Sequence, residues 1–259
     1  MLNRDRARWA LASLLSIAIL SAPAVWNRFP LLQWDTGGYI ARWYEHSLVI
    51  SRSTVYGLFL NAGSALAFWP VVAVQSALTV WVMALTLRAV GSRNRPWLLT
   101  GIIAVLSVLT TLPWLTSILL TDIFAVIGVL GLWLLLMHAD VLSRPERAGL
   151  VLLTAFSAAT HSATIAVLGG LLIVAAVYAR FDRRHLPPRR LTSGAIALAL
   201  GVAMVFAGNY VIARQIAWTP GGFALSFGRM LQAGIVNKYL DAHCPDPYLR
   251  LCKYKDELP

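Results

Sequence analysis

Residues 53–87 read STVYGLFLNAGSALAFWPVVAVQSALTVWVMALTL and include no charged side chain. A membrane span needs about 20 predominantly apolar residues, because about 30 Å of hydrocarbon is crossed at about 1.5 Å per residue. These 35 residues are therefore too many for one simple helix. Pro70 suits a helix boundary, so we expect a helix at about 54–67 followed by one span at about 70–87.

The remainder of the chain is organised in the same way. Uncharged stretches also lie at 9–27, 96–121, 123–139, 148–179 and 191–213. The stretch 148–179 is again long, and we expect a hairpin that turns near His161. Of the 259 residues, 58% are hydrophobic and 13% are charged, with a mean hydropathy of +0.68, whereas a soluble domain carries roughly 25% charged residues. The sequence predicts an all-α integral membrane protein, a polytopic bundle of transmembrane helices.

The basic residues decide the topology. The net charge is +11, and membrane proteins concentrate Lys and Arg in their cytoplasmic loops. One crossing by 53–87 places thirteen of the 22 basic residues inside, whereas two crossings would move ten of these outside. The thirteen are Arg4, Arg6, Arg8, Arg88, Arg93, Arg95, Arg144, Arg147, Arg180, Arg183, Arg184, Arg189 and Arg190. Because the loops account for the charge and no basic face is interleaved with aromatic residues, nucleic acid is not expected as a partner.

The predicted topology has about seven spans and a cytoplasmic amino terminus. The spans lie at about 9–27, 70–87, 97–112, 119–138, 147–160, 162–179 and 191–213. The loop at 28–69 carries helices at the outer lip of the membrane, and a polar tail at 214–259 is extracytoplasmic. A signal peptide cleaved near Ser21-Ala22-Pro23-Ala24 is the alternative for the first span.

The two cysteines, Cys244 and Cys252, both lie in this outer tail. Outside the cytoplasm a pair at short spacing is typical of a disulfide, and two free thiols are the alternative. A metal site would need more ligands than His243 and two cysteines supply. Lys255-Asp256-Glu257-Leu258 is not a retention signal, because Pro259 follows it.

Polar and ionisable residues from separate segments meet at the predicted outer face. They are Asp35, Tyr39, Glu45, His46, Arg52, Tyr56, Asp122 and His161. Ionisable residues at membrane depth are costly and are therefore functional candidates. The cytoplasmic loops, by contrast, hold arginine-rich runs without such a mixture.

Each of these residues also has a purely structural interpretation. Asp35 and Asp122 are both suited to cap the helices that follow them. Arg52 could extend to phospholipid headgroups, and His161 could be a turn residue whose ring bonds a neighbouring carbonyl. Glu45 and His46 fit a solvated helix face. Convergence on one side is the stronger signal, because four segments contribute to it.

One chemistry fits this arrangement. Transfer of a sugar from a lipid phosphate needs a carboxylate base within hydrogen-bond reach of the acceptor. It also needs cationic or metal contacts to the departing phosphate. A lipid substrate arrives from the bilayer, so we expect the site at the membrane lip, where Asp35, Arg52 and the helix at 54–67 lie.

Two stretches carry a resemblance to a known family. Trp34-Asp35-Thr-Gly-Gly-Tyr39-Ile after the first span, then Arg52-Ser-Thr-Val-Tyr56-Gly-Leu-Phe-Leu60, resemble the membrane glycosyltransferases of the GT-C superfamily, over about the first 215 residues. The resemblance implies that Asp35 is the catalytic base and that Tyr39, Arg52 and Tyr56 line the site. It also implies that Asp122 helps to hold the donor phosphate or a metal, so Asp35 and Asp122 are the candidate ligands of a divalent cation. His161 joins them as a candidate substrate-binding residue.

The resemblance implies a function at the outer face of a bacterial inner membrane. A polyprenyl-phosphate donor would give its sugar to an envelope acceptor, with the bilayer and envelope-assembly proteins as partners. Members of the family have more spans and a larger outer domain, and many have two adjacent acids where this chain has Asp35 alone. The polar end of the chain also predicts a fragment of a longer protein. The alternatives are a transporter or flippase of a lipid-linked precursor and a non-catalytic scaffold of a polysaccharide assembly.

Overall fold

The structure is a computed structural model that describes residues 2–92, 94–219 and 222–258. Arg93 of the second basic loop, Gly221 of the tail and Pro259 lie outside the described residues. The chain divides into two compact units, Met1–Trp218 and Thr219–Pro259. The first unit contains all the predicted spans, and the second contains most of the predicted outer tail.

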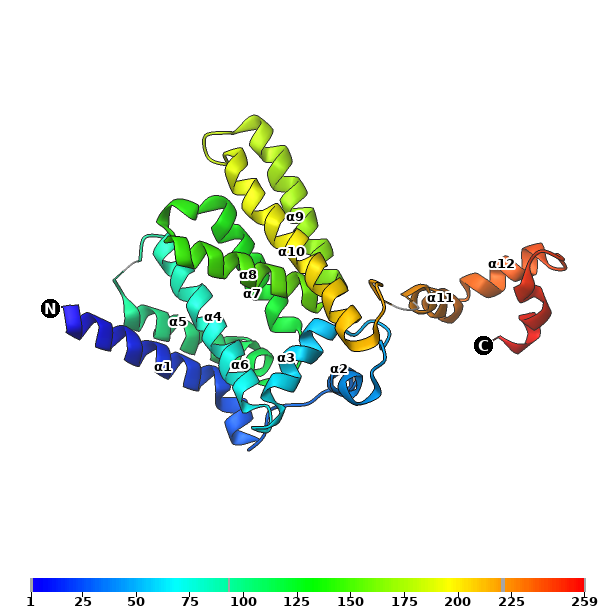
Figure 1. The fold of residues 1–259 in the computed structure, drawn as a ribbon, viewed down its shortest axis with the longest axis horizontal. Helices are drawn as coiled ribbons and strands as arrows, with labels where there is room; N and C mark the ends of the chain where they lie inside the picture. Colours follow the sequence, from blue (N-terminus) through cyan, green and yellow to red (C-terminus); the bar gives the residue numbers. More distant parts are fainter. Residues whose placement is uncertain (1, 93, 220–221, 259) are drawn as a thin grey trace. The chain divides into compact units, whose positions relative to one another are not determined.

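The all-helical prediction is confirmed for the part of the chain that the structure describes, where two segments meet in a single bridge, Leu31 with Ile118, and no strand forms (Figure 1). The helices of the first unit are α1 (Leu2–Trp26), α2 (Trp34–Glu45), α3 (Thr54–Ser64), α4 (Trp69–Ala89), α5 (Pro96–Leu109), α6 (Leu112–Ser117), α7 (Asp122–Met137), the short 3-10 helix η1 (Ala139–Val141), α8 (Arg144–Thr160), α9 (Ser162–Phe181) and α10 (Pro188–Ala213).

In the part of the chain that the structure describes, four helices are long and apolar enough to cross a membrane. They are α1 from Arg4, α4, α9 and α10. The helices α5 and α7 are apolar but have 14 and 16 residues, or about 21 and 24 Å at about 1.5 Å per residue. The helix α8 begins with Arg144, Glu146 and Arg147. A helix therefore lies at each of the seven predicted spans, but only four have the length and composition of a complete crossing.

The long uncharged stretch 53–87 is divided as its length requires. α3 covers its first part, and α4 begins at Trp69 with Pro70 in its first turn, where the missing proline N–H costs no helical bond. Phe68 and Ala67 adopt positive φ between the two helices. The stretch 148–179 is likewise a hairpin, in which α8 ends at Thr160 and α9 begins at Ser162.

Small residues allow the closest helix packing in the first unit. α8 packs against α7 and α10, and α9 lies beside α10 (Figure 1). A Cβ atom added to Gly201 of α10 would lie 2.8 Å from the carbonyl oxygen of Ala155 and 2.9 Å from the Cβ of Ala158. Only glycine therefore permits this approach of the two backbones.

An ion pair joins α4 to the start of α8. Arg88 donates to Glu146 at 2.6 Å, and Ser143 and Glu146 form a capping box at the first turn of α8. The bond from Arg88, followed by the bonds from Ser143, lowers the pKa of Glu146 to about 2. Charged residues at the end of α4 and the start of α8 thus contribute to helix packing as well as to the charge pattern of the loops.

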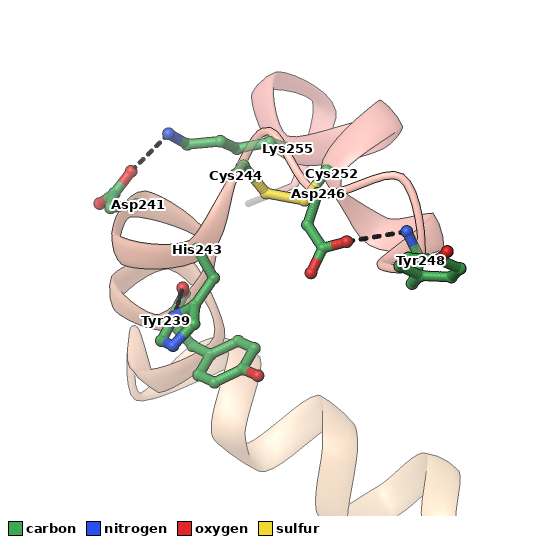
Figure 2. Close-up of a disulfide and its surroundings, with 8 residues drawn as sticks. All are labelled: Tyr239, Asp241, His243, Cys244, Asp246, Tyr248, Cys252 and Lys255. Carbon is green, nitrogen blue, oxygen red and sulfur yellow. Dashed lines mark hydrogen bonds and ion pairs between the residues drawn. A yellow bond between two sulfur atoms is a disulfide. The ribbon is translucent and has the colours of Figure 1, made fainter.

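The second unit is a small disulfide-linked segment, shown in Figure 2. It comprises α11 (Gly222–Gln232), α12 (Ile235–His243) and the 3-10 helix η2 (Arg250–Glu257). Cys244 and Cys252 form a disulfide that links the end of α12 to η2. Lys255 pairs with Asp241 at 2.8 Å across the same joint, so two independent links hold the two short helices together.

We predict that Gly201→Ala destabilises the protein by about 1–3 kcal/mol, because the added methyl group would press against the backbone of α8. Gly101→Ala is the matched control: it lies in α5 with no atom within 4 Å of an added Cβ, and alanine is the better helix former. Thermal unfolding in detergent measures both variants. Equal stability of the two variants would show that α8 and α10 do not pack through Gly201.

We also predict a pH-dependent effect of Glu146→Gln. The pKa of Glu146 falls from 4.5 to about 2 on folding, so the carboxylate stabilises the fold above about pH 5, and this contribution is lost as the pH falls toward 2. The variant should be about 1 kcal/mol less stable than the wild type at neutral pH, with a difference that shrinks in acid. Glu45→Gln, whose carboxylate has no ion pair among the described residues, is the control. A difference that is constant with pH would contradict this role.

Candidate active site

The segment between α6 and α7 is the structural base of the site. Its backbone leaves the helical pattern at 118–121, so its polar groups need other partners. Leu31 supplies two of them, because its N–H donates to Ser117 at 3.0 Å and its carbonyl accepts from Leu119 at 2.9 Å. The hydroxyls of Thr116 and Ser117 donate to the carbonyl of Leu20 in α1. These bonds attach the end of α6 to the second half of α1.

Gln75 of α4 provides the central buried contact. Its side-chain amide donates to the carbonyls of Thr116 and Ile118, both at 3.0 Å. Its carbonyl oxygen accepts a bond of 3.1 Å from the hydroxyl of Tyr56. Gln75 and Tyr56 are both fully buried. One side chain therefore joins α3, α4 and the α6–α7 segment.

The start of α2 is attached to the same segment. The hydroxyl of Thr36 accepts from the backbone N–H of Gln33 at 3.0 Å and donates to the carbonyl of Leu119 at 3.1 Å. Asp35, the preceding residue, forms an ion pair with Arg52. The Arg52 side chain passes beside Gly38, where an added Cβ would lie 3.2 Å from its Cγ. Gly38 thus leaves room for the arginine to reach Asp35.

A pocket of about 310 Å³ lies where α2, α7 and α9 meet. Its polar lining is Asp35, Tyr39, Thr121, Asp122, His161 and Thr164. Its apolar lining includes Leu120, Ala125, Val129 and Val167. Four of the residues predicted from the sequence therefore line one cavity, and a fifth, Arg52, holds Asp35.

Tyr39 forms one wall of the pocket and is 2% exposed. Burial raises the pKa of Tyr39 despite a hydrogen bond with Thr121, so the phenol keeps its proton at neutral pH. The guanidinium of Arg52 lies 5.9 Å from the ring centroid. The Tyr39 ring also meets the Tyr56 ring edge-on, with centroids 5.0 Å apart.

His161 both caps a helix and lines the pocket. Its ring Nδ1 accepts from the backbone N–H of Ala163 at 3.1 Å, at the start of α9. His161 is thus a turn residue, as one interpretation expected, but its Nδ1 bonds a backbone N–H where a carbonyl partner was expected. In the neutral imidazole, an accepting Nδ1 leaves the proton on Nε2, so His161 can donate a hydrogen bond through Nε2.

Two helix-cap interpretations are wrong. Asp35 lies within the first turn of α2, which begins at Trp34, and its carboxylate binds Arg52. Asp122 is the first residue of α7, and Thr121 occupies the cap position. Arg52 contacts protein rather than extending freely to headgroups. Glu45 and His46 are exposed, as expected for a solvated face.

Tyr56 does not line the pocket. It is completely buried behind Tyr39, within a cluster of rings that includes Phe59 and Phe124. Its hydroxyl is bound to Gln75. Tyr56 therefore supports the wall of the pocket instead of contacting a substrate directly.

An apolar groove adjoins this polar pocket. It has a volume of about 560 Å³ and shares Val129 with the pocket. Its lining comes mainly from α7 and α9, with Thr86 from α4; it includes Leu130, Trp133, Met137, Leu171, Val174 and Tyr178. The polar pocket at the beginning of α7 thus continues into an apolar groove along the same helix.

Metal binding by the pocket residues alone is not supported by the geometry. Within the described ranges, no three His, Cys, Asp or Glu side chains are grouped closely enough to hold an ion. Asp35 and Asp122 line the same pocket, but they would need ligands from a substrate to complete a coordination shell.

Comparison with known protein families, with characterised proteins and with solved structures yields no match for this chain. The site is therefore interpreted from its own geometry.

The sequence reasoning missed Gln75, Thr121 and Gly38. Gln75 had a signal, because it is an amide in the middle of an uncharged stretch, where a buried polar side chain needs partners. Thr121 adjoins Asp122, and Gly38 belongs to the Gly-Gly pair before Tyr39. Their roles depend on distant segments, so spacing alone did not reveal them.

We predict that Gln75→Leu destabilises the protein by about 2–4 kcal/mol, because it leaves the Tyr56 hydroxyl and two buried carbonyls without partners. Tyr56→Phe, which removes one bond and leaves the carbonyls paired, should cost about 1 kcal/mol. Thermal unfolding of both single variants and the double variant measures their coupling. Additive effects would show that the two side chains do not act together.

Proposed function

We propose that this chain is a membrane glycosyltransferase, in which a polyprenyl-phosphate donor gives its sugar to an envelope acceptor at the outer face of a bacterial inner membrane. The observation that carries the proposal is a pocket with two carboxylates and a histidine at one side and an apolar groove at the other. A substrate with a charged head and a hydrocarbon chain matches this division. The proposed fold is a GT-C-like bundle of about seven spans.

Asp35 is the proposed base. Its Oδ1 accepts from Arg52, which holds the carboxylate in place and leaves Oδ2 to accept a proton from the acceptor hydroxyl. The hydroxyl oxygen then forms a bond to the anomeric carbon of the sugar. The bond between that carbon and the phosphate oxygen breaks, and the phosphate leaves with the electron pair.

The remaining pocket residues suit the departing phosphate. Nε2 of His161 and the phenol of Tyr39 are both hydrogen-bond donors on the wall of the pocket. Donors placed where negative charge develops lower the barrier to reaction. Asp122 is the second carboxylate, and with the substrate phosphate it could share a divalent cation; no step above depends on one.

The apolar groove suits the polyprenyl chain. Its lining residues on α7 are apolar over about two and a half turns from Val129 to Met137, and Leu171, Val174 and Ala175 of α9 continue this surface. The chain of the lipid would lie along α7 while its phosphate is held at the beginning of the same helix. In this proposal the first unit is the catalytic part, the bilayer supplies the donor, and envelope-assembly proteins are further partners.

We predict that Asp35→Asn lowers sugar transfer at least about 100-fold, the usual effect of losing a general base. Glu45→Gln, an exposed acid of the same helix outside the pocket, should keep full activity. The measurement is transfer from labelled polyprenyl-phosphate sugars by the full chain in nanodiscs, with and without a chelator.

Each other outcome has a distinct meaning. Full activity of Asp35→Asn would contradict the mechanism. Movement of the lipid across proteoliposomes without covalent transfer would identify a transporter or flippase. No activity together with stable co-purification of a larger enzyme would identify a scaffold.

A further inference from the structure

A second polar pocket, of about 290 Å³, lies at the other end of the helices. It is lined by Leu135, Ala139, Asp140, Arg147, Arg189, Arg190 and Ser193. Leu135 of this pocket and Asp122 of the candidate active site lie at opposite ends of α7, about 20 Å apart at about 1.5 Å per residue. The two pockets share no residue, and the charge pattern places this one on the cytoplasmic side.

One of its three arginines is fully engaged within the protein. Arg190 donates to the carbonyl of Met137 at 3.0 Å and to that of His185 at 3.2 Å. It also pairs with Asp140 at 3.0 Å, and its side chain is 16% exposed. Asp140 is thus already neutralised, and Arg190 forms a fixed part of the pocket.

The other two arginines, Arg147 and Arg189, have guanidinium N–H groups that can still donate hydrogen bonds to a ligand. Arg147 donates through Nε to the carbonyl of Leu142 at 3.2 Å, and no carboxylate of the described residues pairs with it or with Arg189. Both guanidiniums line the pocket beside the hydroxyl of Ser193. Arg189 and Ser193 belong to the first two turns of α10, where the helix dipole also favours an anion.

We infer that this pocket binds a phosphate group. Two guanidiniums without a carboxylate partner, a hydroxyl and a helix beginning are groups that recognise phosphate in proteins. The phosphate could belong to an anionic phospholipid headgroup, since the pocket lies at the end of apolar helices, or to a small soluble phosphate. The shared chemistry is the phosphate, and the test distinguishes its sources.

The test compares two double variants that each remove two arginines, one pair from the pocket and one pair from the neighbouring loop, together with a single pocket variant. Arg189→Gln and the double variant Arg147→Gln/Arg189→Gln remove the guanidiniums that have no carboxylate partner. Arg183→Gln/Arg184→Gln removes two arginines of the neighbouring loop that do not line the pocket. The full chain in detergent is titrated with short-chain phosphatidylglycerol, with phosphatidylcholine, and separately with inorganic phosphate. The shift in thermal unfolding gives each apparent affinity.

The expected result is binding of phosphatidylglycerol, at least about tenfold weaker in the double pocket variant and unchanged in the loop variant. Arg189→Gln should show part of this loss without any change in stability, because its exposed side chain makes no bond to the described residues. Binding of inorganic phosphate with the same variant pattern, and no preference for the anionic lipid, would support the site with a soluble ligand. Equal losses in the pocket and loop variants, or no binding by the wild type, would overturn the inference.

Discussion

The non-helical backbone between α6 and α7 is the constraint on which the rest of the first unit depends. Backbone polar groups without partners are very costly in apolar surroundings. Here Leu31, Thr36 and Gln75 supply the partners, from the loop before α2, from the first turn of α2 and from α4. The need to satisfy the backbone polar groups of this short segment therefore brings α4 and the start of α2 together at one junction. Leu20 of α1 is joined to the preceding helix α6 by bonds from the hydroxyls of Thr116 and Ser117.

The junction explains why the pocket residues come together although they are far apart in sequence. Leu119, bound by Thr36, is followed at once by Leu120, Thr121 and Asp122 of the pocket lining. Asp35 precedes Thr36 on the opposite wall. The bond from Thr36 to Leu119 therefore helps to hold the segments that carry the two carboxylates beside each other. The buried rings of Tyr39 and Tyr56 fill the space behind them.

Much of the fold and of the candidate site could be predicted from the sequence, because the hydropathy and charge of a segment are properties of that segment alone. The helices at 54–64 and 69–89 and the turn at His161 follow from the length of the uncharged stretches. The predicted topology put Asp35, Tyr39, Asp122 and His161 on one side of the membrane, and the structure gathers them in one pocket. Burial of Tyr56 and the role of Gln75 could not be predicted, since they depend on which distant carbonyls are left without partners. The start of α7 at Asp122, three residues later than predicted, has the same cause.

The acidic residues of the pocket are tolerated because of where they lie on their helices. Asp35 and Asp122 both occupy first turns, and His161 caps a third helix. The partial positive charge of a helix beginning stabilises a carboxylate by about 0.3–1 kcal/mol. Arg52 adds a full positive charge beside Asp35. The same helix beginnings would also favour the phosphate of the proposed donor. The candidate active site therefore differs in charge from the arginine-rich pocket at the other end of α7. In that pocket the excess charge is positive, and the carboxylate in its lining, Asp140, is paired with Arg190.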